Sequence, residues 1–239
     1  MGELTAVLNA ATGSLGLKLT SGQLEQFEKF YALLVEANKS FNLTAITDER
    51  EVAIKHFLDS LTCQATVNLN GAPKIVDIGT GAGFPGIPLK IYRPGIMLTL
   101  VESLEKRVKF LNDAVAALGL SGTRVIHARA EDFCRDGEHR EQYDLVVARA
   151  VAGLPVLAEY CLPAVKLGGL FVAMKGPKVE DETKAAKSAL SILGGTLENV
   201  IQLRLPLSGD ERNLVMVRKI GPSPAKYPRR AGMPQKKPL

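Results

Sequence analysis

Four glycines lie within the segment VDIGTGAGFPG, residues 76–86, directly after a short apolar run. Glycine lets the backbone take positive φ values and approach a ligand closely. The spacing Gly81-x-Gly83-x-x-Gly86 also matches the fingerprint of dinucleotide-binding loops, in which the next helix directs its N-terminal amides at the ligand. Because glycine loops also end strands for structural reasons, the segment predicts a nucleotide-like ligand only together with acidic partners.

Three acidic residues lie at or just after the carboxyl ends of predicted strands. Asp77 precedes the glycines, and Glu102 lies about 20 residues further on, where it could accept hydrogen bonds from the ribose hydroxyls of an adenosine. Ala130 and Glu131 follow a third strand and could read the adenine edge. NAD and S-adenosylmethionine both fit this pattern. S-adenosylmethionine is favoured because no further substrate domain follows and Asp77 could face an amino-bearing ligand.

Four more polar residues have a type and position that suit chemistry. His56 and Asp59 share one face of a predicted helix, where a histidine beside a carboxylate is often an ordinary hydrogen-bonded pair. Arg149 follows the fourth strand and could clamp the donor carboxylate, donate to O6 and N7 of guanine, or form a surface salt bridge. Lys175 follows the fifth strand, as a phosphate contact or a solvated lysine.

Composition and charge narrow the class of protein. The chain has 239 residues, a hydrophobic fraction of 46% and a net charge of +5. No long apolar segment or leader is evident, so we expect a cytoplasmic protein without a membrane span. The three cysteines are far apart and predict neither a metal site nor disulfides. The final segment KYPRRAGMPQKKPL has five basic residues and no acid, which suits nucleic acid, an anionic lipid surface or a solubilising role.

The elements that must position these residues form an α/β pattern. A capping box at Thr20-x-x-Gln23 predicts a helix to about Asn38, and a second helix is expected from Asp48 to about Leu61. Five strands alternating with helices predict a doubly wound parallel sheet, and two final strands without a helix between them predict an antiparallel hairpin. We expect a helical extension over 1–68, an α/β domain over 69–220 and a basic tail over 221–239. The predicted strands are Lys74–Ile78, Met97–Val101, Arg124–Ala128, Asp144–Val147, Leu170–Met174, Ile201–Leu205 and Leu214–Arg218.

Several segments together resemble the RsmG family, also called GidB: FNLTAIT, IKHFLDSL, VDIGTGAGFPGIPLKI, LVESLEKRVKFLN, HARAEDF, YDLVVARAVA and KYPRRAGMPQKKPL. The resemblance implies a class I, Rossmann-like methyltransferase fold, S-adenosylmethionine as methyl donor and N7 of a guanine in 16S ribosomal RNA as acceptor. It places the donor site on Gly79, Phe84, Ala130, Glu131 and Arg149, with Glu102, Ser103 and Leu104 beside the ribose. Asp77 and Gly81 of the loop join this set. The sequence Ala148-Arg149-Ala150 departs from members that have Ser before the Arg.

The chemistry expected of such an enzyme needs little from the protein. Guanine N7 carries a free lone pair, so no general base is required. The chain lacks the Asn/Asp-Pro-Pro-aromatic motif of amine methylases after the fourth strand, and Cys161 is not placed as a cytosine-methylase nucleophile. Arg149, His56 and Asp59 are the catalytic candidates, and an acceptor-side role for the last two is implied only by the family segment.

The tail then becomes the expected RNA contact. Its cations would neutralise phosphates and Tyr227 could stack on an unpaired base. The predicted RNA-binding residues are Lys175, Lys226, Tyr227, Arg229, Arg230, Lys236 and Lys237. We expect a monomer that acts on 16S rRNA within the 30S subunit or an assembly intermediate. An NAD-dependent oxidoreductase and a non-catalytic rRNA-binding assembly factor are the alternatives.

Overall fold

The computed structural model describes residues 2–67, 69–71, 73–149 and 151–239, with only the backbone for 65 and 66. These residues contain a seven-stranded sheet in the order β3-β2-β1-β4-β5-β7-β6. β1 to β5 are parallel, and β7 runs antiparallel to both β5 and β6. The predicted parallel sheet with an antiparallel end is therefore confirmed. The strands are β1 (Lys74–Ile78), β2 (Met97–Glu102), β3 (Thr123–His127), β4 (Tyr143–Arg149), β5 (Val165–Lys175), β6 (Gly195–Arg204) and β7 (Glu211–Lys219).

The helices near the N-terminus extend beyond the predicted ones. The capping box at Thr20 and Gln23 is formed, and its helix α2 continues to Phe41. The predicted second helix is a continuous run in which the middle part, η2, is a π-helix. A separate first helix, α1, was not predicted. The helical segments are α1 (Glu3–Thr12), η1 (Gly13–Leu15), α2 (Ser21–Phe41), α3 (Glu49–Val52), η2 (Ala53–Leu58), α4 (Asp59–Thr66), α5 (Gly86–Tyr92), α6 (Glu105–Ala117), α7 (Ala130–Arg135), α8 (Leu154–Cys161), η3 (Leu162–Ala164), α9 (Glu180–Ile192) and α10 (Met233–Lys236).

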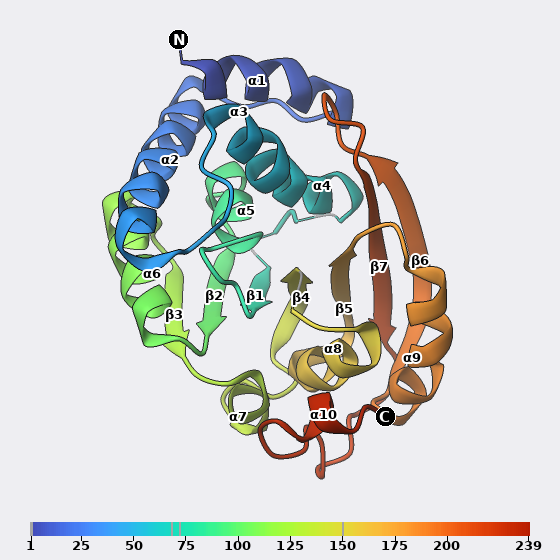
Figure 1. The fold of residues 1–239 in the computed structure, drawn as a ribbon. Coiled ribbons are helices and arrows are strands. Elements are labelled where there is room, and N and C mark those ends of the chain that lie inside the picture. The colour runs from blue at the N-terminus through green and yellow to red at the C-terminus, as the bar shows by residue number, and fades with distance from the viewer. Residues whose placement is uncertain (1, 68, 72, 150) are drawn as a thin grey trace.

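Successive residues of the central strands pack into two different hydrophobic clusters, one on each face of the sheet. Ile75 of β1 packs in the cluster built by α1 to α6, whereas Val76 and Ile78 pack in the cluster built by α7 to α9. This alternation follows from the two-residue period of a strand, and it explains the continuous apolar run of β1, which is buried on both faces. Figure 1 shows the helices arranged on the two sides of the sheet.

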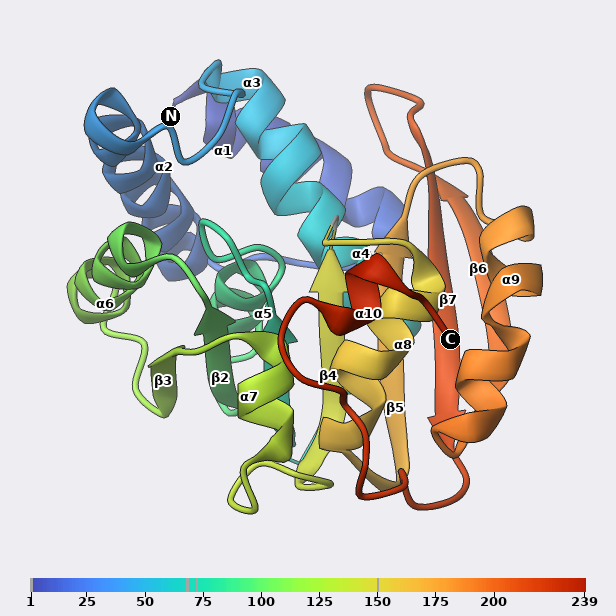
Figure 2. The same cartoon turned by 60° about the horizontal axis from the view of Figure 1, so that its bottom comes forward.

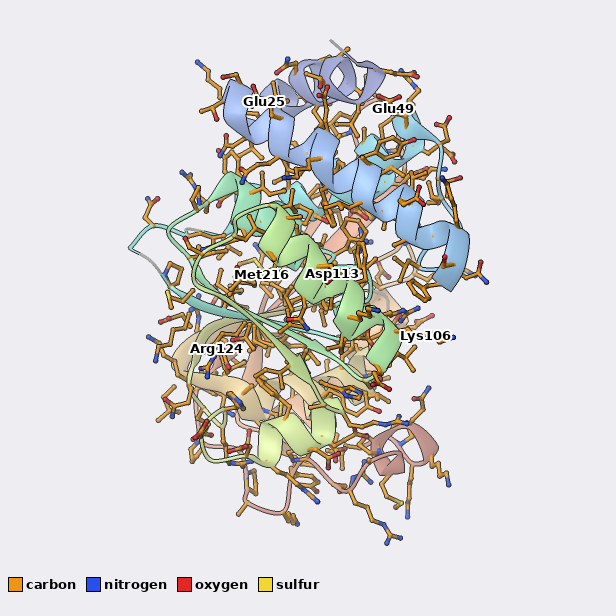
Figure 3. All side chains as sticks on the ribbon, turned by 90° about the vertical axis from the view of Figure 1, so that its left-hand side faces the viewer. Glu25, Glu49, Lys106, Asp113, Arg124 and Met216 are labelled. Carbon is orange, nitrogen blue, oxygen red and sulfur yellow. The ribbon has the colours of Figure 1, made fainter. Side chains whose placement is uncertain are left out.

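The N-terminal helices pack directly on the sheet domain. Phe27, Phe30 and Phe57 belong to the same cluster as Met216 of β7. Glu49, labelled in Figure 3, accepts a hydrogen bond from the Leu4 backbone N–H at 2.8 Å and so ties α3 to α1. Figure 3 also shows α2 beside α6 on the outer surface. Residue 68, the predicted boundary of this extension, lies outside the described residues.

The chain ends on the opposite side of the molecule. After β7 it passes α7 and α8 and finishes in the short helix α10, which packs against α8 (Figure 2). None of the helices in the described part of the chain has the length and apolarity needed to cross a bilayer. The helices α7, α8 and α10 each contribute residues to the space at the carboxyl ends of β1 to β3.

Candidate active site at the carboxyl edge of the sheet

The loop between β1 and α5 has two glycines at positions where neighbouring atoms leave no room for a side chain. Gly79 has a φ of 70°, and a Cβ atom there would lie 2.8 Å from a Val151 methyl group. At Gly86 a Cβ atom would lie 2.5 Å from Leu100 and 2.9 Å from Asp77 Oδ2. Glycine is therefore required at both positions, by backbone conformation at the first and by packing against β2 at the second.

Asp77 shapes this loop from beneath. It is fully buried, and its Oδ2 accepts hydrogen bonds from Thr80 Oγ1 at 2.6 Å and from the Gly86 N–H at 2.8 Å. Its Oδ1 has no hydrogen-bond partner among the described residues. Burial raises the pKa of Asp77 to about 6, although both hydrogen bonds oppose that shift. The structure thus places Asp77 under the loop, where it fixes the path of the glycines.

Glu102 stands at the end of β2, the next strand in the sheet. Its carboxylate is 4% exposed and accepts hydrogen bonds from the backbone N–H groups of Gly81 at 3.0 Å, Ser103 at 2.8 Å and Leu104 at 2.9 Å. Arg107 Nη1 lies 3.6 Å from Glu102 Oε2. Leu104 therefore meets Glu102 through its backbone, with its side chain exposed, whereas Ser103 also donates to Glu102 Oε1 from its hydroxyl at 3.4 Å.

A cavity of about 140 Å³ opens where β1, β2 and β3 end. Glu131, on the first turn of α7, is 3% exposed and its Oε1 accepts a hydrogen bond from the Gly232 N–H at 2.8 Å. The position is the switch point of the sheet, where β1 is flanked by β2 on one side and β4 on the other, and ligands of such folds bind there. The residues around the cavity are Ile78, Gly79, Val101, Ser103, Ala128, Arg129, Ala130, Glu131, Val151, Tyr160 and Gln235.

A second group of side chains meets on the other side of the same loop. The Phe84 ring stacks on His56 with centroids 4.6 Å apart, and the guanidinium carbon of Arg149 lies 5.0 Å from the Phe84 centroid. Arg149 Nη1 donates to Asp59 Oδ2 at 3.2 Å. The structure therefore brings the three catalytic candidates together around Phe84. Ala150, which follows Arg149, lies outside the described residues.

His56 is a neutral imidazole in this group at ordinary pH. Burial, together with the positive charge of Arg149, lowers its pKa to about 4. Its Nε2 lies 2.8 Å from Thr44 Oγ1. Among the described residues, no hydrogen bond or ion pair joins His56 to Asp59. Arg149 contacts the carboxylate, and the Phe84 ring packs against both the His56 ring and the Arg149 guanidinium. A neutral histidine here can exchange hydrogen bonds without adding a further cation beside Arg149.

Arg212, at the start of β7, completes the group and was missed by the sequence analysis. Its Nε donates to Asp59 Oδ1 at 3.1 Å, so one carboxylate bridges two guanidinium groups. Asp59 is 4% exposed, and two cations offset the cost of burying its charge. The pairing joins residues 153 positions apart in the chain. In the sequence, Arg212 lies in a polar turn between the last two predicted strands. A single sequence therefore held no signal that it pairs with Asp59.

The residues predicted to contact RNA separate into two groups. Tyr227 is 8% exposed, and Arg229 is paired with Glu159 at 2.6 Å. Lys175 is paired with Glu182 at 2.7 Å and also donates to a backbone carbonyl. Tyr227 is therefore buried in the packing of the tail, and Arg229 and Lys175 are half-buried and held by neighbouring carboxylates. The exposed members are Lys226, Arg230, Lys236 and Lys237.

The arrangement fits an adenosyl ligand. A buried carboxylate ends β2, Ser103 and Ala130 line a cavity beyond it, and the bare backbone at Gly79 faces the same space. Among the described residues no His, Cys, Asp and Glu side chains gather in a group of three that could hold a metal ion. The site thus offers hydrogen bonds, one neutral imidazole and the two half-buried guanidinium groups of Arg149 and Arg212 for chemistry.

Comparison with known proteins identifies the family. The family described as "rRNA small subunit methyltransferase G" matches residues 23–215. Proteins called ribosomal RNA small subunit methyltransferase G from Pelotomaculum thermopropionicum and Desulforamulus reducens are 57% and 52% identical over 239 residues, which cover 100% of this chain and of each relative. A SAM-dependent methyltransferase structure from Aquifex aeolicus has a TM-score of 0.56 at 15% identity, covering 75% of this chain and 97% of the other, which shows the shared fold. The chain belongs to the rRNA small subunit methyltransferase G family.

Proposed function

We propose that the protein transfers a methyl group from S-adenosylmethionine to N7 of a guanine in 16S ribosomal RNA. The observation that carries the proposal is that the glycine loop between β1 and α5 borders the cavity at one residue and the group of His56 and Arg149 at another. Gly79 faces the cavity at the ends of β1 to β3, and Phe84, five residues later, supports His56 and Arg149. A donor and an acceptor held on the two sides of this loop would meet without a further domain.

The donor would be held by groups from three strands. Glu102 is proposed to accept hydrogen bonds from the ribose, with Ser103 and Leu104 beside it. Ala130 and Glu131 are proposed to contact the adenine, and Gly79 and Gly81 would let the backbone pass close to the ligand. When bound, the sulfonium supplies an electrophilic methyl group. Asp77 keeps the loop in the shape that this contact requires.

The acceptor chemistry needs orientation more than proton transfer. Guanine N7 is a hydrogen-bond acceptor with a free lone pair at neutral pH, so no residue has to remove a proton from it. His56, with its pKa near 4, adds no positive charge to those of Arg149 and Arg212 in this part of the site. Arg149 is proposed to face the donor carboxylate, held in direction by Asp59 and by the Phe84 ring. These residues position the reactants, and Phe84 excludes water from the loop.

The RNA would meet the surface near the donor cavity. We propose that the exposed tail cations Lys226, Arg230, Lys236 and Lys237 neutralise phosphates and fix the position of the RNA. Buried Tyr227 and paired Arg229 and Lys175 would support that surface rather than touch RNA directly. The substrate would be the 30S subunit or an assembly intermediate, and the enzyme would act in the cytoplasm as a monomer.

The test is transfer of a labelled methyl group to defined acceptors. Purified protein with labelled S-adenosylmethionine should methylate 30S subunits or 16S rRNA from cells that lack this protein. Mapping the label should locate it at a guanine N7, where methylation makes the glycosidic bond sensitive to cleavage. RNA binding without transfer, or binding of NAD in place of S-adenosylmethionine, would overturn the proposal.

A further inference from the structure

The C-terminal segment, residues 221–239, is bound to the body of the protein as a strap. Arg140 Nη1 donates to the Tyr227 carbonyl at 2.8 Å, and its Nη2 donates to the Ser223 carbonyl at 2.7 Å. Arg135 Nε donates to the Pro228 carbonyl at 2.8 Å. Guanidinium groups of the body thus satisfy backbone carbonyls along the strap, and charge-assisted bonds of this kind are among the stronger ones in proteins.

A buried acid on α8 fixes the middle of the strap. The Glu159 side chain is 1% exposed, and its Oε1 accepts hydrogen bonds from the Arg229 backbone N–H at 2.7 Å and from Arg229 Nε at 2.9 Å. Its Oε2 accepts from Arg229 Nη2 at 2.6 Å. A carboxylate buried without its cation is strongly unfavourable. The buried Glu159 on α8 is therefore stable only when the strap is docked and Arg229 is in place. The basic tail is thus an integral part of the domain surface.

The far end of the strap reaches the donor cavity. The Gly232 N–H donates to Glu131 Oε1 at 2.8 Å, and Gly232 has a φ of 81°, which directs the chain into α10. Three residues later Gln235 lines the cavity together with Ala130 and Ser103. Figure 2 shows α10 lying over α8 at this place. Within the described residues, the Gln235 amide has no hydrogen-bond partner.

We infer that the strap completes the donor site and that Gln235 is a donor-binding residue on the adenosyl side of the cavity. The inference rests on the proposed function for the nature of the ligand. A side-chain amide offers both donors and an acceptor, which suits the mixed edge of an adenine or a ribose hydroxyl. Gln235 and Glu131 would then contact the ligand side by side. The segment from Gly232 to Gln235 donates a hydrogen bond to Glu131 at its first residue and ends in Gln235.

The experiment measures S-adenosylhomocysteine binding to the full-length protein by calorimetry. Gln235→Ala should bind the probe about three- to tenfold more weakly, the range expected for one lost hydrogen bond. A chain ending at Gly232 keeps the Arg229 and Gly232 contacts and should lose at least as much affinity. Gln202→Ala, an exposed glutamine on the edge strand β6, is the matched control and should bind like the wild type.

The control measurements separate contact from folding. The thermal midpoint of ligand-free Gln235→Ala should equal that of the wild type, and S-adenosylhomocysteine should slow tryptic cleavage at the strap in the wild type because binding stabilises the docked state. Wild-type affinity in both Gln235→Ala and the shortened chain would overturn the inference while leaving the proposed function intact. A wild-type protein that does not bind the probe at all would overturn the proposed function, and the inference with it.

Discussion

At the scale of single residues, the guanidinium groups of Arg149 and Arg212 share the Asp59 carboxylate, which leaves one net positive charge in a fixed place. Arg149 lies half-buried between Asp59 and Phe84, and the neighbouring His56 is held neutral by burial and by Arg149 itself. A reaction that delivers positive charge to a purine would be hindered by a further cation that no carboxylate neutralises. The lowered pKa of His56 is therefore consistent with the proposed methyl transfer, in which His56 has no proton to give or take.

The pH dependence of stability tests the state of His56. Its folded pKa of about 4 lies below the unfolded value of about 6.5, so its contribution to stability is complete above pH ~6.5 and is lost as pH falls toward 4. Urea unfolding should show that the wild type loses about 2 kcal/mol more than His56→Gln over this window. Asp77 titrates in the same range with the opposite sign, but it is present in both proteins and cancels in the difference. Parallel profiles for the two proteins would contradict the neutral His56.

Glu102 provides a direct test of donor binding. In Glu102→Ala the backbone N–H groups of Gly81, Ser103 and Leu104 lose their acceptor, and the proposed ribose contact is lost as well. We expect affinity for S-adenosylhomocysteine to fall on the order of tenfold to a hundredfold, as for hydrogen bonds to a charged group. Glu105→Ala, an exposed acid three residues away, is the control for the change in charge. Equal affinity in the two variants would remove Glu102 from the donor site.

Which of these residues the sequence could predict depends on how local their signal is. Glu102 and Arg149 end strands, so strand order and spacing alone brought them to the carboxyl edge. Arg212 reaches Asp59 from 153 positions away, and Arg229 reaches Glu159 from 70. Such pairings depend on how the hairpin and the tail fold back, and an unaligned sequence has no local pattern that reports them.

At the scale of elements, the β6–β7 hairpin supports the site although it lies at the edge of the sheet. Its first residues on β7 contribute Arg212 to Asp59, which stands at the junction of η2 and α4 and holds Arg149 from β4. Three distant elements thus meet at one carboxylate. The strands themselves were predictable from short apolar runs, because burial on both faces leaves little choice of residue. Their full length was not, and β5 extends from Val165 where the apolar run alone indicated Leu170.

Removing the Arg212 guanidinium should disturb the position of Arg149 more than the binding of the methyl donor. In Arg212→Met the Asp59 carboxylate keeps Arg149 but loses its second anchor, so the direction of Arg149 becomes less fixed. We expect kcat for methyl transfer to fall on the order of tenfold, with less than about twofold change in S-adenosylhomocysteine affinity. Arg204→Met, which breaks an exposed ion pair with Glu211 on the same hairpin, should leave both values near the wild type. A similar loss in both variants would indicate a general effect on the hairpin.

At the scale of the whole molecule, the excess positive charge lies in the segment that also borders the donor cavity. The last fourteen residues hold five cations and no acid, which equals the net charge of +5 for the entire chain. In the folded protein one of them, Arg229, is neutralised by Glu159, whereas the exposed cations stand on the outer side of the strap. RNA attracted to this charge would therefore arrive next to the bound donor.

The salt dependence of RNA binding measures this effect. Changing the four exposed strap cations to Gln should weaken 16S rRNA binding and reduce the slope of log affinity against log salt by about 3, because each phosphate contact contributes about 0.7 on single-stranded RNA. Gln at four other exposed lysines gives the same change in net charge and should alter the slope by less than about 1, since a distant charge releases no counterion from the bound RNA. The first set is Lys226, Arg230, Lys236 and Lys237, and the control set is Lys18, Lys74, Lys184 and Lys187. Equal slopes for the two variants would mean that net charge alone attracts the RNA and that the strap is not its landing surface.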